Sequence, residues 1–475
     1  MNFQTKIDIL DNLSKLDILI FSTVLFITIF SVLYSETLKK KKASEESEEE
    51  SFLDLLVMGR TLTLPMFVAT LVATWYGGIF GVTEIAFNEG IYNFITQGLF
   101  WYIAYIIFAI FITHKIVPYK AVTLPDLVGK MFGQKSAKLS AVFNLFNVLP
   151  IAYTISLGLF LTLIFGGSLL INMIIGVTFV ILYSMWGGLR SVVFSDLIQF
   201  SVMCISVLLV LVLSISTFGG LEFLKTNLPD THFTFTGKNT ILETLAWGFI
   251  ALSTLVDPNF YQRCFAAKSE KVAKKGIFIS TSIWFLFDIC TTFGAMYARA
   301  VIPEAESSQA YLTYAIQLLP AGLKGLFLAG ILATILSTLD SYLFIAGTNV
   351  AYDLVPKKLK GRKVIHHFGV IFVGFLSIAL AVVFDGNIKT VWKTLGSYSA
   401  SCLLLPVIFG YIFPRKIRDN QFIAICLTGV IFTTIWKIID REGIWANIDE
   451  LYVGIMATSF ATAISLFYDA KRLKN

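Results

Sequence analysis

The sequence predicts an all-α membrane protein that crosses the bilayer about 13 times, and three observations support this fold class. The 475 residues are 56% hydrophobic and only 14% charged, whereas soluble domains have nearer a quarter of their residues charged. The mean hydropathy is +0.77. Apolar runs long enough to span a bilayer as helices recur along the whole chain.

The composition also argues against several classes of function. The net charge of +6 does not indicate nucleic-acid binding, because the basic residues lie in short loops between apolar runs. The five cysteines are scattered without a CxxC pair and are interpreted as packing residues. With only four histidines, all in loops or at the ends of apolar runs, a haem held by two histidines within the membrane is not expected.

The first apolar run, residues 18–34, is predicted to be an uncleaved span. A lysine run at 39–42 follows it, where a cleavable signal would have small residues. The acidic run at 45–50 is interpreted as a solvated loop. The other predicted spans are at residues 58–86, 91–113, 137–165, 168–185, 191–218, 239–258, 273–302, 321–353, 364–384, 388–412, 420–437 and 450–468.

The loop charges predict the orientation of these spans. Every other loop is basic, and basic loops face the cytoplasm, so the N-terminus is expected outside and the C-terminus inside. The basic residues expected in the cytoplasmic loop after the span at 239–258 are Arg263, Lys268, Lys271, Lys274 and Lys275. The longest outer loops, near 219–239 and 303–320, are too short for a catalytic domain, so no enzyme is expected.

The most polar of the buried stretches is residues 329–347. In a helix, the 3–4 spacing of its hydroxyl residues places them on one face at about mid-membrane depth. These residues are Thr334, Ser337, Thr338 and Ser341, and Asp340 lies beside them. Hydrocarbon offers such oxygens no partner, which indicates an ion or solute site. The alternative is that each hydroxyl bonds back to the carbonyl one turn earlier.

A second unusual stretch lies inside the predicted span at 58–86. Gly77, Gly78 and Gly81 sit in an apolar run, and glycine in a helix interior costs about 1 kcal/mol relative to alanine. A break in this helix is therefore expected, and a break would expose carbonyl oxygens that suit a hard cation. A close helix crossing through small residues is the alternative.

Asp196 is the third polar feature, because it lies inside the predicted span at 191–218. A carboxylate within the membrane indicates a functional site, and the alternative is a structural pair with Arg190. Asp288, Glu243 and Asp257 also have apolar neighbours, but they lie near span ends or lack polar neighbours at helical spacing. They are interpreted as structural pairs or loop-facing groups rather than ligands.

Polar patches in three other predicted spans are candidates for the lining of a solute cavity, although ordinary helix packing explains each patch alone. Together with the tyrosine at the expected helix break, the candidate cavity residues are Tyr76, Gln97, Trp247, Ser253, Thr254 and Tyr398.

Five stretches together resemble the sodium:solute symporter family, which includes proline, pantothenate, sialic acid and sodium/glucose transporters. They occur in the family order and cover roughly residues 60–410. The stretches are GRTLTLP, ATWYGGIFGVTEIAFNEG, WGGLRSVVFSDLIQF, DPNFYQRCFAAKSEKVAKKG and ATILSTLDSYLFIAGTNVAYDL.

The resemblance implies a LeuT-type core of two inverted five-helix repeats, each beginning with a broken helix. The implied division is residues 1–57 (first helix and charged cytoplasmic loop), 58–218 and 219–412 (the repeats) and 413–475 (two further helices). The implied sodium ligands are carbonyls near Thr74 and Gly77 with Thr334, Ser337 and Thr338. Asp196 matches an aspartate that helps some members hold a second sodium. Tyr76 stands where the proline-type pattern has an acidic residue, which argues against proline as the solute.

The sequence thus predicts a sodium-driven symporter for a small organic solute in the plasma (inner) membrane, with sodium as the coupling ion and no nucleic-acid partner. A proton-coupled or sodium-independent carrier that uses Asp196 is one alternative. A transporter-like membrane solute sensor is another, and the lack of a predicted output domain after Asn475 argues against it. The solute, the stoichiometry and the oligomeric state do not follow from the sequence.

Overall fold

The computed structural model describes residues 3–42, 48–184, 188–360, 362–443, 445 and 448–472. The start of the acidic run at 45–50, Trp186 and Gly187 of the WGGLR stretch, and residues 473–475 lie outside these ranges. Within the described ranges the regular structure is helical, and the only pairing of extended backbone joins Leu62 to Ala267. The all-helical fold class is therefore confirmed.

Ten helical segments among the described residues are long and apolar enough to cross a membrane. They are Lys15–Ser35, Ile91–Tyr119, Gln134–Phe165, Gly188–Phe218, Ile241–Ala266, Glu270–Val301, Leu323–Leu354, Lys363–Val383, Ile388–Ile412 and Asp419–Ile438. Three shorter apolar helices, Leu64–Ala73, Leu169–Ser184 and Glu450–Leu466, fall in the other stretches predicted to span. A count of thirteen stays a prediction, because these three are shorter than a bilayer-spanning helix.

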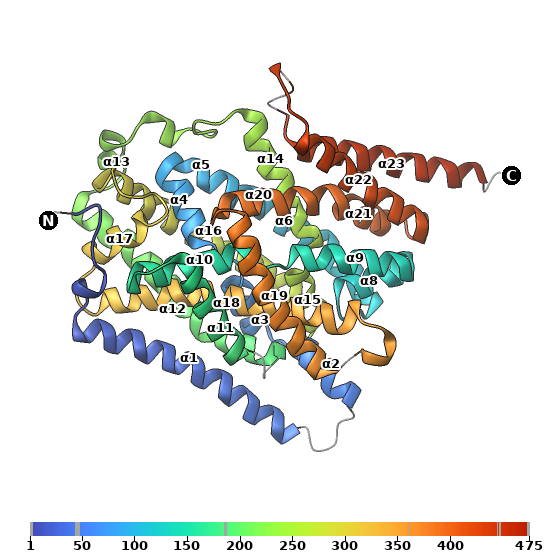
Figure 1. The fold of residues 1–475 in the computed structure, drawn as a ribbon, viewed down its shortest axis with the longest axis horizontal. Helices are drawn as coiled ribbons and strands as arrows, with labels where there is room; N and C mark the ends of the chain where they lie inside the picture. The colour runs from blue at the N-terminus through green and yellow to red at the C-terminus, as the bar shows by residue number, and fades with distance from the viewer. Residues whose placement is uncertain are drawn as a thin grey trace.

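Most helices of the described chain are labelled in Figure 1. Those of the first half are α1 (Lys15–Lys42), α2 (Glu48–Val57), α3 (Leu64–Ala73), α4 (Ile79–Glu89), α5 (Ile91–Asn93), α6 (Phe100–Ile107), α7 (Thr113–Ile116), α8 (Leu124–Phe132), α9 (Gln134–Asn147), α10 (Ile151–Phe165), α11 (Leu169–Ser184), α12 (Gly188–Phe218) and α13 (Leu221–Asn227). Those of the second half are α14 (Ile241–Leu252), α15 (Pro258–Ala266), α16 (Glu270–Val301), α17 (Ala310–Leu318), α18 (Leu323–Thr348), α19 (Lys363–Val383), α20 (Ile388–Ser399), α21 (Leu405–Ile412), α22 (Asp419–Ile438) and α23 (Glu450–Arg472).

Helix α18 forms the centre of the bundle. The apolar window of this helix is entirely buried, as expected for a helix that is hydrophobic all round. It packs against α10, α12 and α19, and α1 runs along the edge of the molecule over α12 and α18 (Figure 1). The hydroxyl ladder predicted from the sequence is therefore held inside the protein rather than against lipid.

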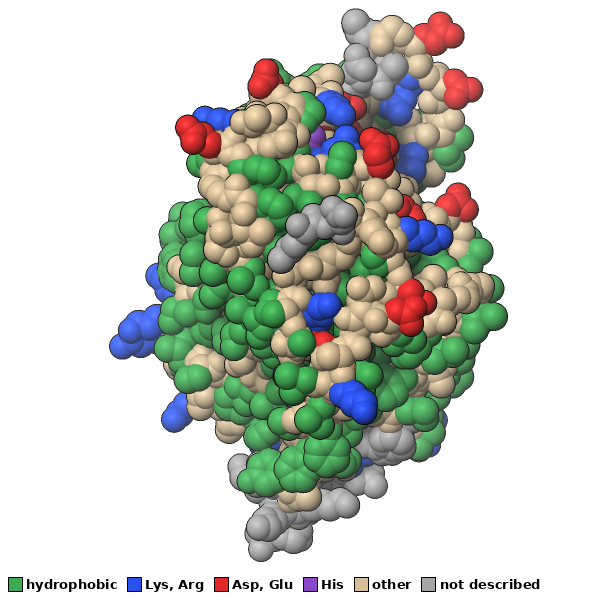
Figure 2. All heavy atoms as spheres, turned by 90° about the vertical axis from the view of Figure 1, so that its left-hand side faces the viewer, with side chains coloured by type: hydrophobic (Ala, Val, Ile, Leu, Met, Phe, Trp, Pro, Cys, Tyr) green, Lys and Arg blue, Asp and Glu red, His purple; other side chains and the backbone are tan. Residues whose placement is uncertain are grey.

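The outer surface is largely apolar, as lipid contact requires. Figure 2 shows hydrophobic side chains over much of one face, with many of the charged ones gathered toward its upper end. Large apolar side chains are exposed on peripheral helices, including Phe26 and Phe30 of α1 and Met456 and Phe460 of α23. Such a surface is unfavourable in water and suited to hydrocarbon.

The predicted break in the span at 58–86 is confirmed. Helix α3 ends at Ala73 and α4 begins at Ile79, so the GG pair lies in the non-helical link between them. Gly77 and Gly78 let other helices approach this link closely. A Cβ on Gly77 would lie 2.5 Å from Cβ of Thr338, and a Cβ on Gly78 would overlap the indole ring of Trp392.

A second interrupted helix occurs at α14 and α15. Asp257 adopts an extended conformation (φ −80°, ψ 121°) and Pro258 begins α15, because a residue before proline disfavours helical angles and proline suits the first helical position. The predicted span end at residue 258 and the placement of Arg263 in a cytoplasmic loop are wrong. Helix α15 continues to Ala266 and buries Arg263 completely.

Candidate ion and solute site

Four oxygen atoms from two helices converge at the end of α3. Ser337 Oγ donates to the carbonyl oxygen of Ala73 at 2.8 Å and lies 3.2 Å from that of Thr334. Thr338 Oγ1 lies 3.4 Å from the Ala73 oxygen and 3.1 Å from the Thr334 oxygen. We call this set, the two hydroxyls and the two carbonyls, the oxygen ring. All four residues are buried.

The oxygen ring has the donor chemistry of a site for a hard monovalent cation. Its atoms are neutral oxygens, which hard cations prefer, and rotation of the two hydroxyl protons would free lone pairs for an ion. Among the described residues no group of three His, Cys, Asp or Glu side chains is placed to hold a metal. The candidate ion site in the ring consists of hydroxyl and carbonyl oxygens.

Of the predicted ion ligands, some contribute oxygens to the ring and others do not. Ser337 and Thr338 face the broken helix, whereas the hydroxyl of Thr334 bonds back to the carbonyl of Gly330 at 2.7 Å, so residue 334 offers its carbonyl oxygen. The oxygen that α3 contributes to the ring is that of Ala73, one residue before Thr74. Gly77 contacts Thr338 by close packing.

Thr74, at the end of α3, belongs to a second polar cluster. This cluster meets α18 at Ser341, one turn beyond Ser337. The Thr74 hydroxyl donates to the Thr70 carbonyl at 2.5 Å and accepts from Arg263 Nη2 at 2.7 Å. The same guanidinium nitrogen donates to Ser341 Oγ at 2.8 Å and lies 3.3 Å from Thr70 Oγ1. Arg263 Nη1 donates to Asn259 Oδ1 at 3.0 Å. The guanidinium thus ties α15 to α3 and α18.

Asp196 lies against this cluster. Its Oδ2 accepts a 2.5 Å hydrogen bond from Thr70 Oγ1, and its buried Oδ1 has no hydrogen-bond partner. Thr70 therefore stands between the carboxylate and the Arg263 guanidinium. A second buried carboxylate, Asp340, accepts from Tyr183 at 3.0 Å and also interacts with Arg263. Arg263 therefore interacts with three buried carboxylates, those of Asp196, Asp340 and Asp257.

The alternative in which Arg190 pairs with Asp196 is wrong. Arg190 Nη2 instead lies 3.2 Å from Asp54 Oδ1 in α2, at the end of α12. Arg190 was considered as the partner of Asp196 because the two residues are close in sequence. The cation that the fold brings to Asp196 is Arg263, which is distant in sequence and was assigned to a loop.

A cavity with a volume of about 110 Å³ opens beside the broken link of α3 and α4. Its walls come from this link and from the segments around α4, α6, α9, α10, α14, α18 and α20. The lining residues are Trp75, Tyr76, Val82, Gln97, Trp101, Asn147, Leu149, Ala152, Tyr153, Ile250, Ser253, Asp257, Tyr342, Val391, Trp392, Leu395 and Gly396. Because Tyr342 follows the oxygen ring by one turn of α18, the candidate ion site and the cavity share a helix.

The predicted cavity residues divide into two groups. Tyr76, Gln97 and Ser253 line the cavity. Trp247, Thr254 and Tyr398 are outside its lining, and the hydroxyl of Tyr398 pairs with that of Thr434 on α22 at 2.9 Å. The sequence analysis did not predict that Trp75, Trp101, Trp392 and Asp257 line the cavity.

Asp257 owes its position to the local sequence. Its Oδ1 accepts from the backbone nitrogens of Asn259 (2.8 Å) and Phe260 (3.3 Å) and so caps α15, a role that aspartate performs well. The other two carboxylates set aside with it have partners within the protein. Glu243 forms a capping box with Thr240, and Asp288 accepts a hydrogen bond from Tyr102.

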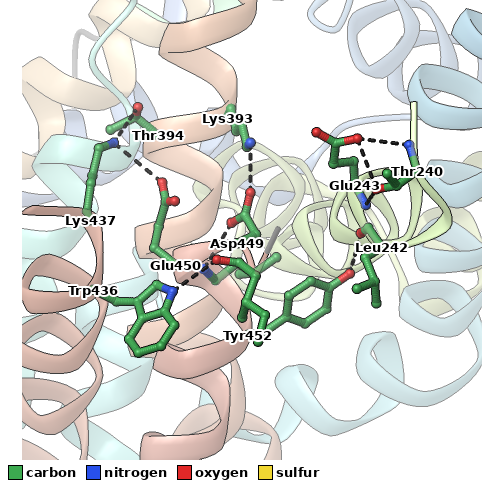
Figure 3. A network of polar contacts seen from close by, with 12 residues as sticks. Thr240, Leu242, Glu243, Lys393, Thr394, Trp436, Lys437, Asp449, Glu450 and Tyr452 are labelled. Atoms are coloured by element: carbon green, nitrogen blue, oxygen red, sulfur yellow. Dashed lines mark hydrogen bonds and ion pairs between the residues drawn. The ribbon is translucent and has the colours of Figure 1, made fainter. Parts of the chain in front are cut away.

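A network of ion pairs fixes the cavity wall formed by α20 (Figure 3). Lys393 of α20 lies 2.7 Å from Asp449, and Lys437 of α22 donates to Thr394 at 2.9 Å while lying 3.6 Å from Glu450. These contacts join α20 to α22 and to the start of α23. They hold Trp392, the neighbour of Lys393, over Gly78.

Comparison with known proteins gives a consistent result. The model of the sodium:solute symporter family matches residues 55–427. A sodium/pantothenate symporter of Haemophilus influenzae is 28% identical over 238 residues, which are 45% of this chain and about half (49%) of that relative. The sodium/proline symporter of Salmonella typhimurium is 25% identical over 375 residues, 72% of each chain. The sodium/glucose cotransporter of Vibrio parahaemolyticus is 25% identical over 391 residues, 72% of this chain and 69% of that one.

Solved structures show the same fold. A Na+-coupled sialic acid symporter in a substrate-bound outward-open state superposes with a TM-score of 0.75 at 15% identity, covering 95% of this chain and 98% of that one. Mhp1, a nucleobase-cation-symport-1 family transporter in a closed conformation, gives a TM-score of 0.54 at 12% identity, covering 86% and 93%. These likenesses show a LeuT-type fold.

Proposed function

Because the chain belongs to the sodium:solute symporter family, we propose that it is a secondary active transporter that couples inward sodium movement to uptake of a small organic solute. The observation that carries this proposal is the oxygen ring, since it joins the interrupted helix α3 to the central helix α18. A sodium ion in the ring would link the two helices only when they are close together. Ion binding would then favour one conformation of the cavity beside them.

We propose that one sodium ion binds in each transport cycle. Ala73, Thr334, Ser337 and Thr338 are its proposed ligands. The carbonyls near Thr74 and Gly77, in the same link, stay candidate sodium ligands. We propose that Asp196 positions Arg263 rather than holding a second sodium, because the guanidinium already brings a positive charge to the hydroxyls around this carboxylate.

One sodium is enough for useful accumulation. Inward movement of one ion yields about 2.3 kcal/mol per 100 mV and about 1.4 kcal/mol for each tenfold gradient. Together these terms support a solute gradient of roughly two to three orders of magnitude. The mechanism we propose is alternating access with two five-helix repeats, 58–218 and 219–412. The charge pattern of the loops supports a plasma-membrane orientation with the N-terminus outside and the C-terminus in the cytoplasm.

Substitution of the ring hydroxyls tests the ion site. Sodium should raise the thermal stability of the detergent-solubilised protein by mass action, and Ser337→Ala or Thr338→Ala should raise its half-saturating concentration at least about tenfold, since a bond to a charged group contributes about 1.5–3 kcal/mol. Both variants should still fold, because each loses only a small polar group.

Thr348→Ala is the matched control. Thr348 is buried on the same helix, nearly three turns beyond Thr338, and its hydroxyl has no hydrogen-bond partner. Its sodium titration should match that of the unmodified protein. If Ser337→Ala and Thr338→Ala also leave the titration unchanged, the hydroxyls only bond within the bundle and the proposed ion site is wrong.

A further inference from the structure

We infer that the cavity binds a small organic ammonium ion, a solute with a positively charged, alkylated nitrogen and no carboxylate. The inference rests on the proposed function, because it takes the cavity beside the oxygen ring as the solute site. It goes further by naming the chemical class of the solute. Three features of the lining carry it: its charge, its aromatic faces and its volume.

The charge of the lining is negative. Asp257 is the only charged residue of the lining, and no basic side chain among the described residues lies within 4.0 Å of its carboxylate. Arg263, on the same helix, attracts Asp257 only without direct contact, and its Nη atoms point at Asn259, Thr70, Thr74 and Ser341 instead. A carboxylate in a mostly apolar cavity is costly unless a cation accompanies it. A solute in the cavity can supply the cation in direct contact that the protein does not.

The carboxylate is also fixed in place. Asp257 caps α15 through its Oδ1, and the following proline restricts its backbone. It is 8% exposed, which is consistent with a side chain that reaches a cavity without facing bulk water. A fixed, partly desolvated carboxylate is suited to hold one positive charge at one place rather than to recognise several hydroxyl groups.

The rest of the lining presents aromatic rings. Six of its side chains are aromatic: Trp75, Tyr76, Trp101, Tyr153, Tyr342 and Trp392. Some are arranged edge to face, with ring centroids 5.2 Å apart for Trp75 and Trp101 and 4.8 Å apart for Tyr153 and Tyr342. Aromatic faces attract cations, and alkylated ammonium groups are the ligands that aromatic cages recognise best.

The volume sets the size of the solute. At about 110 Å³, the cavity is somewhat smaller than the engineered cavity of roughly 150 Å³ that takes up benzene. The volume is of the right order for a solute of about five to seven non-hydrogen atoms, such as tetramethylammonium or an ammonium with three methyl groups and a short alcohol chain. Anionic solutes meet no basic residue in the lining, and neutral polyols leave the charge of Asp257 uncompensated.

The test compares choline with 3,3-dimethyl-1-butanol, an uncharged analogue of the same shape. Binding to the full chain in detergent is followed by tryptophan fluorescence in sodium buffer, with tetramethylammonium, myo-inositol and pantothenate as further probes. We expect choline to bind at least about tenfold more tightly than the uncharged analogue, because only the cation gains from the carboxylate and the rings. Equal binding of the two, or tighter binding of myo-inositol or pantothenate than of choline, overturns the inference.

Variants locate the interaction. Asp257→Asn keeps a good helix cap and should remove the difference between choline and its analogue. Trp392→Leu should weaken choline binding more than Trp392→Phe does. Trp436→Leu, outside the cavity lining, should leave it unchanged. Choline binding that neither Asp257→Asn nor Trp392→Leu affects overturns the inference. If a variant does not fold, the comparison of choline with its uncharged analogue on the unmodified chain still tests the inference.

The same preparation separates this inference from the proposed function. Stabilisation of the protein by sodium is measured beside choline binding. If sodium stabilises the protein but choline binds no better than its analogue, the solute class is wrong and sodium coupling stands. If sodium gives no stabilisation beyond that of potassium, the proposed function fails, whatever the probes do.

Discussion

Removal of Arg263 is expected to be among the most damaging single substitutions in the bundle. Arg263→Ala removes a guanidinium that makes three hydrogen bonds of 3.0 Å or less, to Asn259, Thr74 and Ser341. It also leaves Asp196 and Asp340 buried without a nearby positive charge. Removing one partner from a buried charge cluster costs about 3–5 kcal/mol, a large share of a typical stability of about 5–15 kcal/mol.

Equilibrium unfolding in mixed detergent micelles measures this cost. The double variant Arg263→Ala with Asp196→Asn should be more stable than Arg263→Ala alone, because it removes one of the charges that the arginine left uncompensated. Arg190→Ala, which breaks the pair with Asp54 at the end of α12, is the matched control and should cost about 1 kcal/mol. The reasoning is refuted if Arg263→Ala costs no more than Arg190→Ala, or if Asp196→Asn adds to the damage instead of relieving it.

Two further predictions concern the helix break and an outer loop. Gly77→Ala places a Cβ 2.5 Å from Cβ of Thr338, so it should destabilise the protein by about 1–3 kcal/mol and weaken sodium stabilisation; an unchanged sodium titration would show that the ring does not depend on this contact. His232, in the loop between α13 and α14, is buried, and burial lowers its pKa below the ordinary 6.5; its Nε2 contacts the Phe87 carbonyl at 3.1 Å and its buried Nδ1 has no partner. The folded state therefore binds fewer protons than the unfolded state, and stability should fall as pH drops below 6.5. His232→Gln should reduce this dependence in thermal unfolding across the same pH range, and an identical pH profile would contradict the assignment.

The sequence predicted the parts of the fold that depend on composition and local pattern. Apolar runs located the helices because a bilayer-spanning segment must be long and hydrophobic. The glycine cluster at Gly77 and Gly78 located the break in the first interrupted helix. The 3–4 spacing of Ser337 and Thr338 placed both hydroxyls on one face of α18, and the fold turns that face toward Ala73.

Features that depend on long-range packing were not predictable in this way. Arg263 was assigned to a loop because it follows the apolar run at 239–258. The hydroxyls of α3 and α18 that surround it come from distant parts of the sequence, so no local pattern reveals them. Asp257 looked like a loop-facing carboxylate for the same reason. The spacing of Thr334 and Ser337 places both on one face of the helix. The hydroxyl of Thr334 nevertheless bonds within its own helix, because spacing does not determine the side-chain rotamer.

Direct measurement of sodium binding tests the central claim. Radiolabelled sodium is titrated into the purified chain by equilibrium dialysis, with unlabelled sodium or potassium as competitor. We expect one saturable sodium per chain, which unlabelled sodium displaces and potassium does not. We also expect that binding is lost or weakened at least about tenfold when Ser337 or Thr338 becomes alanine and is kept in Thr348→Ala. No saturable sodium binding, or saturable binding that survives both ring substitutions unchanged, would contradict it.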